Sequence, residues 1–95
     1  MPYSNFEVTF TIPGAQSLKD KRMVVKSVKQ RCKSRFNVSV AECGENDKWQ
    51  LCRMCFAYAA INPSAAEKGM QGIIEYLYSD DRIDIVDIEK SQEET

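Results

Sequence analysis

The sequence predicts a ferredoxin-like α+β domain, in which a four-stranded antiparallel sheet carries two helices on one face. One observation is the order of elements along the chain: strand, helix, strand, strand, helix, strand. Another is that both strand–helix–strand crossovers must be right-handed, which brings the two helices to the same face. At 95 residues and 43% hydrophobic, the chain suits one domain with one core. We assign residues 1–90 to this domain and expect the polar tail, 91–95, to fray.

The first half of the chain is predicted to form a strand, a helix and a second strand. Apolar residues occupy every second position over 6–12, which is typical of a strand with one apolar face. Ser17 with Asp20 three residues later resembles a capping box and predicts the start of a helix. Alternation over 36–42 predicts the second strand. The helix between them has an apolar face formed by Leu18, Val25, Val28 and Cys32.

The second half of the chain repeats this pattern. Residues 48–60 predict a long strand whose apolar second half fits a central position in the sheet, beside the first strand. Ser64 with Glu67 predicts a second capped helix, and residues 83–88 predict the last strand. The second helix has an apolar face formed by Ala66, Met70, Ile73 and Leu77.

A row of cations is the strongest functional signal in the chain. Its members follow one another at steps of three and four residues, which stacks them on one side of the first helix. They lie about a quarter-turn from the apolar face, on a shoulder that faces solvent. The row consists of Lys19, Arg22, Lys26, Lys29 and Lys33, with Lys21, Arg31 and Arg35 as expected flanks.

Three interpretations of the cationic row are open. It could be a solvated helix face, a binding surface for a polyanion such as structured or ribosomal RNA, or a contact for an acidic partner. Residues 17–35 hold eight of the 13 cations and only one acid, whereas 75–95 hold eight acids and two cations. Such segregation bears on partners rather than on the fold. The acidic segment could therefore itself neutralise the row, within one molecule or in a homodimer.

The uncovered face of the sheet offers a second candidate surface. Trp49, Leu51 and Arg53 share a face of the third strand and should point away from the helices. Exposed Trp and Leu suggest a contact surface, which favours self-association as the alternative function. Stacking of RNA bases on this face is disfavoured because the first strand would place Glu7 beside them.

The four cysteines do not predict a metal site. Cys52 and Cys55 form a C-x-x-C pair, but residues three apart on a strand point to opposite faces and cannot share an ion. The chain has no histidine to complete a mixed site. We expect buried structural thiols, with Cys43 or Cys55 as redox-sensitive surface thiols at most, and no disulfides in a cytoplasmic protein.

Catalysis and membrane insertion are also disfavoured. Without histidine, a general base at neutral pH would need a strongly shifted group, and no phosphate-binding loop or nucleophile elbow occurs. No apolar run reaches ~18 residues, and the first residues do not resemble a signal peptide. We therefore predict a cytoplasmic, non-catalytic binding protein without cofactor, metal or membrane partner.

Three segments resemble the YlxP-like family of small uncharacterised bacterial proteins. The resemblance covers nearly the whole chain and implies a ferredoxin-like fold, but no established activity. Genes of this family often lie among those for translation initiation and ribosome maturation, which points to RNA or the ribosome. The cysteines depart from the family's usual pattern. The matching segments are 12–22 (IPGAQSLKDKR), 35–42 (RFNVSVAE) and 47–50 (DKWQ).

Overall fold

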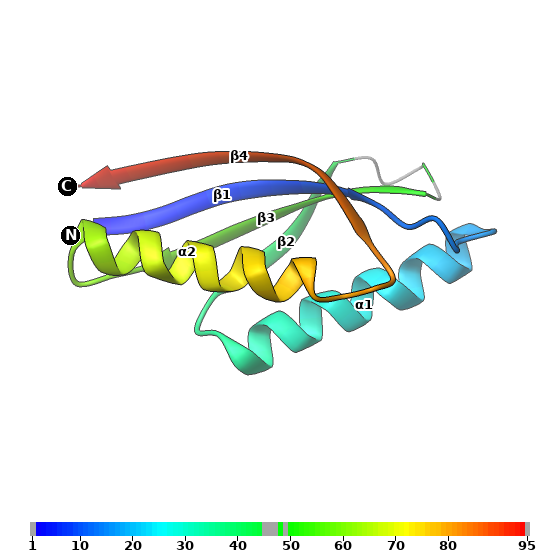
Figure 1. Cartoon of the computed structure of the whole chain (residues 1–95), viewed down its shortest axis with the longest axis horizontal. Coiled ribbons are helices and arrows are strands. Elements are labelled where there is room, and N and C mark those ends of the chain that lie inside the picture. Colours follow the sequence, from blue (N-terminus) through cyan, green and yellow to red (C-terminus); the bar gives the residue numbers. More distant parts are fainter. Residues whose placement is uncertain (1, 45–47, 49, 95) are drawn as a thin grey trace.

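The computed structural model has the predicted ferredoxin-like fold. It describes residues 2–44, 48 and 50–94, with only the backbone described for residues 2 and 91–94. The elements are β1 (Pro2–Thr11), α1 (Leu18–Arg35), β2 (Ser39–Gly44), β3 (Leu51–Ala59), α2 (Pro63–Tyr78) and β4 (Asp84–Glu94). The sheet order is β2-β3-β1-β4 and every pairing is antiparallel, so β1 and β3 are central as predicted. Both helices lie on one face of the sheet (Figure 1).

The hydrophobic core fills the layer between the sheet and the helices. Alternate residues of β1 and β3 point into it, and the buried rings of Phe6 and Phe56 stack with their centroids 4.9 Å apart. Val25, Val28 and Cys32 of α1 are buried against the sheet, whereas the predicted core residue Leu18 is partly exposed. The predicted apolar face of α2 is buried in full: Ala66, Met70, Ile73 and Leu77.

The two helices begin differently. Ser17 caps α1 as predicted, since its Oγ accepts a hydrogen bond from the Asp20 backbone N–H at 3.1 Å. The predicted Ser64 cap of α2 is wrong. Asn62 is the N-cap instead, with its Oδ1 accepting from the Ala65 N–H at 2.8 Å. Pro63 then takes the first helical turn, where its fixed φ suits a helix and its missing N–H leaves no donor without a partner.

All four strands differ from the predicted ranges at their ends. β1 begins at Pro2, four residues earlier than predicted, and ends at Thr11, one residue earlier. β2 starts and ends later than predicted, and β3 is shorter at both ends. Residues 91–94, expected as part of a frayed tail, continue β4. The reason is that β1 begins at Pro2, so its backbone offers pairing partners as far as Glu94.

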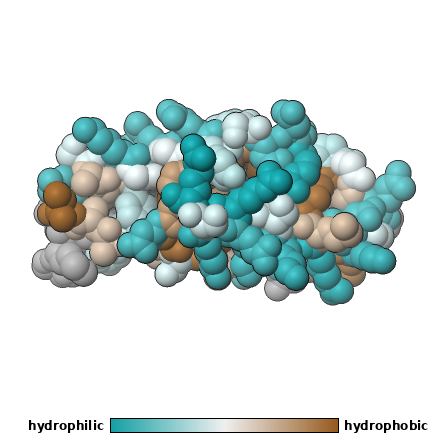
Figure 2. All heavy atoms as spheres, turned by 90° about the horizontal axis from the view of Figure 1, so that it is seen from below, coloured by the Kyte–Doolittle hydropathy of each residue, from teal (hydrophilic) through white to brown (hydrophobic). Residues whose placement is uncertain are grey.

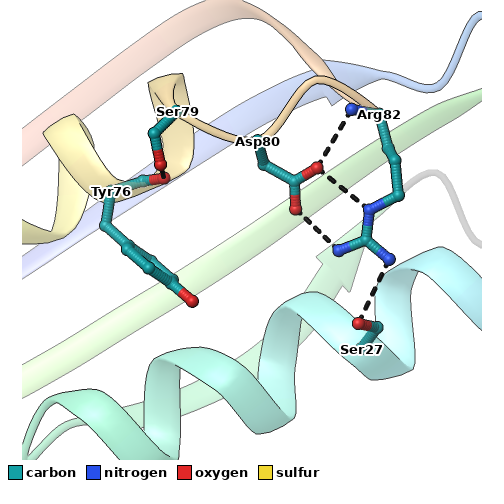
Figure 3. A network of polar contacts seen from close by, with 5 residues as sticks. All are labelled: Ser27, Tyr76, Ser79, Asp80 and Arg82. Carbon is teal, nitrogen blue, oxygen red and sulfur yellow. Dashed lines mark hydrogen bonds and ion pairs between the residues drawn. The ribbon is translucent and has the colours of Figure 1, made fainter.

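A network of polar contacts joins the α2–β4 turn to α1 (Figure 3). The Arg82 guanidinium donates to both carboxylate oxygens of Asp80, at 2.7 and 3.0 Å, and to the Ser27 Oγ at 3.1 Å. These hydrogen bonds from Arg82 hold the pKa of Asp80 below its ordinary value. The network fixes the two helices relative to each other at this end of the sheet.

The side chain of Tyr58 in β3 packs against α2 at Gly69. Its hydroxyl donates a hydrogen bond to the Ala66 carbonyl oxygen. A Cβ on Gly69 would lie 2.7 Å from the Tyr58 Oη and 2.8 Å from its Cε2, closer than packed atoms allow. At Gly72 the nearest atom to such a Cβ is the Phe36 Cε1, at an ordinary 3.8 Å. The lack of a side chain at Gly69 therefore permits the close approach of α2 to the sheet.

These two glycines should respond oppositely to alanine. Gly72→Ala should raise the free energy of unfolding by about 0.5–1 kcal/mol, because alanine is the better helix former. Gly69→Ala should lower it by about 1 kcal/mol, because overpacking against Tyr58 costs more than the helix propensity gains. Urea unfolding followed by circular dichroism measures both. Equal stabilisation by the two substitutions would contradict the packing of Tyr58 on α2.

Candidate nucleic-acid interface

An open groove of about 610 Å³ runs along the side of α1 that faces β2. Four cations of the predicted row line it: Arg22, Lys26, Lys29 and Lys33. Lys21 and Glu42 also line it, so the groove contains five cations and one carboxylate. Seen from the helix side, hydrophilic side chains gather over the middle of this face (Figure 2). The structure thus places most of the row along one positively charged concave surface.

The cationic row is accessible and not neutralised by its surroundings. Lys29 is half-buried and the other four cations are exposed. Within the described part of the chain, none of the five has a carboxylate within ion-pair distance. β4, which carries much of the acidic segment, forms the sheet edge opposite β2. Among the described residues, the acidic segment therefore does not neutralise the row within one molecule.

Lys21 does not flank the row as predicted. Its side chain is only 2% exposed, and its Nζ donates to the Lys48 carbonyl oxygen at 2.7 Å and lies 3.7 Å from the Glu42 Oε2. Residues 21, 25, 28 and 32 share one helical face, so Lys21 lies in line with the buried stripe of α1. That spacing was visible in the sequence. Lys21 and its carboxylate partner thus belong to the floor of the groove.

Arg31 and Arg35 do not adjoin the row either. They lie on the opposite flank of α1, which faces α2. The Arg35 guanidinium carbon lies 5.0 Å from the ring centroid of Tyr76 in α2, within the range of a cation–π contact. The pKa of Asp80 is lowered chiefly by its hydrogen bonds to Arg82, and the charge of Arg31 contributes. The predicted contact surface therefore narrows to the five row residues, of which Lys19 is not among the residues that line the groove.

The uncovered face of the sheet has the predicted composition where it is described. Leu51 and Arg53 lie opposite Thr11 and Thr9 of β1 and are half-buried. The Arg53 Nε lies 3.9 Å from the Glu7 Oε2. Trp49 lies outside the described residues. Self-association through this face stays a prediction.

The cysteines pair differently from the prediction. Cys52 is buried and Cys55 lies on the uncovered face, which confirms that this C-x-x-C pair cannot meet. Cys55 instead forms a disulfide with Cys43 of β2, so the expectation of unpaired thiols is wrong for these two. A shift in the β2–β3 register between Glu42 and Gly44 makes Cys43 an extra, bulged residue. The bulge brings the two Cα atoms to 6.0 Å, a usual distance for a disulfide.

Fold and groove together define a small ferredoxin-like α+β protein with a cationic helix flank. Neither described helix is apolar over a length that could cross a bilayer. Residues 4–90 match the model of the family described as "Protein of unknown function (DUF503)". The uncharacterized protein YlxP of Bacillus subtilis (strain 168) is 40% identical over 67 residues, which cover 68% of this chain and 71% of that protein. The chain belongs to this YlxP-like DUF503 family, which confirms the resemblance seen in its sequence.

Proposed function

We propose that this protein is a cytoplasmic, non-catalytic accessory protein that binds RNA, free or in ribosomal particles, along the cationic groove. The observation that carries the proposal is the groove itself. Four aligned cations line one wall, without a described carboxylate close enough to pair with them. The lone carboxylate of the lining, Glu42, already faces the buried Lys21. An anion in the groove would thus contact cationic side chains that no described carboxylate neutralises.

The length of the row favours a polymer over a small anion. From Lys19 to Lys33 the row rises by about 21 Å along the helix axis, at ~1.5 Å per residue. A single phosphate could contact only one or two of these cations. A chain of phosphates could contact several at once and would release its condensed counterions on binding.

Like-charge repulsion within the row supports the same conclusion. Cations three and four residues apart destabilise a helix by a few tenths of a kcal/mol per pair, roughly. Bound phosphates would relieve this repulsion, so binding and helix stability should reinforce each other. Contacts of this kind carry little sequence information, and we expect recognition of RNA shape rather than of bases.

RNA is favoured over an acidic protein partner by the family resemblance, because the genes of YlxP-like proteins often lie among translation genes. Self-association through Leu51 and Arg53 remains the alternative, and a homodimer would leave the groove on α1 uncovered. The two functions are therefore compatible in one molecule.

RNA affinity should fall steeply with salt. For three to five engaged phosphates, the logarithm of the association constant should decrease against the logarithm of salt concentration with a slope of about −2 to −4. Fluorescence anisotropy of a labelled structured ribosomal RNA fragment, titrated at several salt concentrations, measures this slope. A slope near zero, or no binding even at low salt, would reject the cationic groove as an RNA site.

A further inference from the structure

Three potential metal ligands meet on the uncovered face of the sheet, away from the cationic groove. They are the Glu7 carboxylate of β1, the Cys55 sulfur of β3 and the Cys43 sulfur of β2. Their ligand atoms all lie within 4.8 Å of one another. The residues come from three neighbouring strands, so the sheet fixes their separation. Residue spacing along the chain does not indicate this cluster, because its members are up to 48 positions apart.

Sheet register and the β2 bulge produce this cluster. Glu7 and Cys55 are directly paired across β1 and β3, and the Cys55 Sγ lies 3.9 Å from the Glu7 Oε1. Cys43 lies two residues after Ala41, which pairs with Cys55, so strand alternation places the Cys43 side chain on the same uncovered face, next to the register shift of β2. Cys43 is exposed, and the other two are half-buried. The cluster is therefore open to solvent on one side and backed by the sheet on the other.

We propose that the reduced form of this protein binds a thiophilic divalent cation, Zn²⁺ by the chemistry of the donors, through Cys43, Cys55 and Glu7. Two thiolates and one carboxylate are a donor set that suits Zn²⁺, and the open side leaves a fourth position for water. In the oxidised form the two sulfur atoms are bonded to each other and cannot act as thiolate ligands. Metal binding and the disulfide are thus mutually exclusive states of one site.

Conversion between the disulfide form and the metal-bound form needs a two-electron reductant in one direction and a two-electron oxidant in the other. A dithiol or phosphine reductant supplies two electrons that break the Cys43–Cys55 bond, and two protons complete the thiols. Binding of Zn²⁺ then forms two metal–sulfur bonds and releases those two protons. Reoxidation by a small-molecule disulfide withdraws two electrons, forms the S–S bond again and frees the metal ion.

The surroundings favour one defined site. The Arg53 Nε lies 3.9 Å from the Glu7 Oε2 and offsets part of the negative charge that two thiolates and a carboxylate bring together. Cys32 and Cys52 are buried and do not compete for the ion. Burial raises the pKa of Cys32 to about 11 and that of Cys52 to about 12, so both remain neutral thiols at physiological pH.

Titration of the reduced 95-residue chain with Co²⁺ tests the proposal. The chain is reduced with a phosphine, freed of metal and kept anaerobic, and its four thiols are counted under denaturing conditions. Co²⁺ should then give thiolate-to-metal charge-transfer absorption that saturates at one ion per chain and disappears when Zn²⁺ is added. A fully reduced chain without this absorption, or an oxidised chain that binds Co²⁺ equally well, would overturn the proposal.

Matched variants assign the ligands. Cys43→Ser and Cys55→Ser should each abolish the charge-transfer spectrum of the site, whereas Cys52→Ala, which removes a buried thiol of β3, should retain it. Glu7→Gln should weaken binding by at least about tenfold, since even groups that only support a ligand are worth that much. Asp87→Asn, which removes a β4 carboxylate opposite Thr9, two residue pairs from the Glu7–Glu89 pair, should leave binding unchanged. Equal effects of Glu7→Gln and Asp87→Asn would exclude Glu7 as a ligand.

Discussion

Exchange of Lys26 and Lys29 for glutamate is expected to abolish RNA binding while the fold stays intact. Both side chains line the groove, and neither forms an ion pair with a described residue whose loss could destabilise the chain. The substitutions remove two phosphate contacts and add two charges that repel the RNA backbone. A milder pair, Lys26→Gln and Lys29→Gln, should reduce the salt slope by about 2, at roughly one per lost contact.

Fluorescence anisotropy and sedimentation with ribosomal particles measure the loss, and circular dichroism tests the fold. The matched control compares Lys26→Glu with Lys68→Glu, since Lys68 is an exposed lysine on α2 away from the groove. Both single variants change the net charge equally. If Lys68→Glu weakened binding as much as Lys26→Glu, the effect would come from overall charge and not from the groove. Unchanged binding by the double glutamate variant would reject the assignment.

Reduction of the Cys43–Cys55 disulfide is expected to lower the free energy of unfolding by about 3 kcal/mol when metal is absent. The bond closes a short loop that contains the β2–β3 connection. A disulfide across a loop of this length restricts the unfolded chain and thereby stabilises the folded state by about that amount. For a domain of this size, such a loss is a large fraction of the total stability. Urea unfolding with and without a phosphine reductant, in the presence of a chelator, measures it.

The double variant Cys43→Ser, Cys55→Ser is the control for this measurement. Its unfolding midpoint should match that of the reduced chain and should not respond to the reductant, because Cys32 and Cys52 are free in both. Addition of Zn²⁺ should raise the unfolding midpoint of the reduced chain but not that of the double variant. The reason is that a metal ion bound to the folded state shifts the unfolding equilibrium toward that state. Identical midpoints for the oxidised and reduced chains would contradict a stabilising disulfide.

Features that depend on residue spacing within one helix or strand were predicted correctly from the sequence. The alternation in β1, the apolar face of α2 and the Ser17 cap depend on spacing within one element, and the structure confirms them. The cationic row also depends on helical spacing alone, and four of its members line one groove. The Ser64 cap failed because two competing signals, Asn62 and Pro63, precede it.

Contacts between elements could not be predicted in the same way. Helical spacing aligns Lys21 with the buried stripe of α1, but its polar partners, the Lys48 carbonyl and the Glu42 carboxylate, come from elsewhere in the chain. Arg31 and Arg35 belong to the other flank because α2 packs there. Cys43 meets Cys55 because of a single bulged residue in β2. Each outcome depends on how two elements meet, which periodicity does not encode.

The sequence by itself determined the fold class, the helical face of the core and the charge of one flank of α1, because each follows from residue spacing within a single element. Only the tertiary structure decided which cations share a groove and which sulfurs meet. Those contacts depend on strand register, on a bulge and on where each helix settles on the sheet, and these are set by packing between residues far apart in the chain.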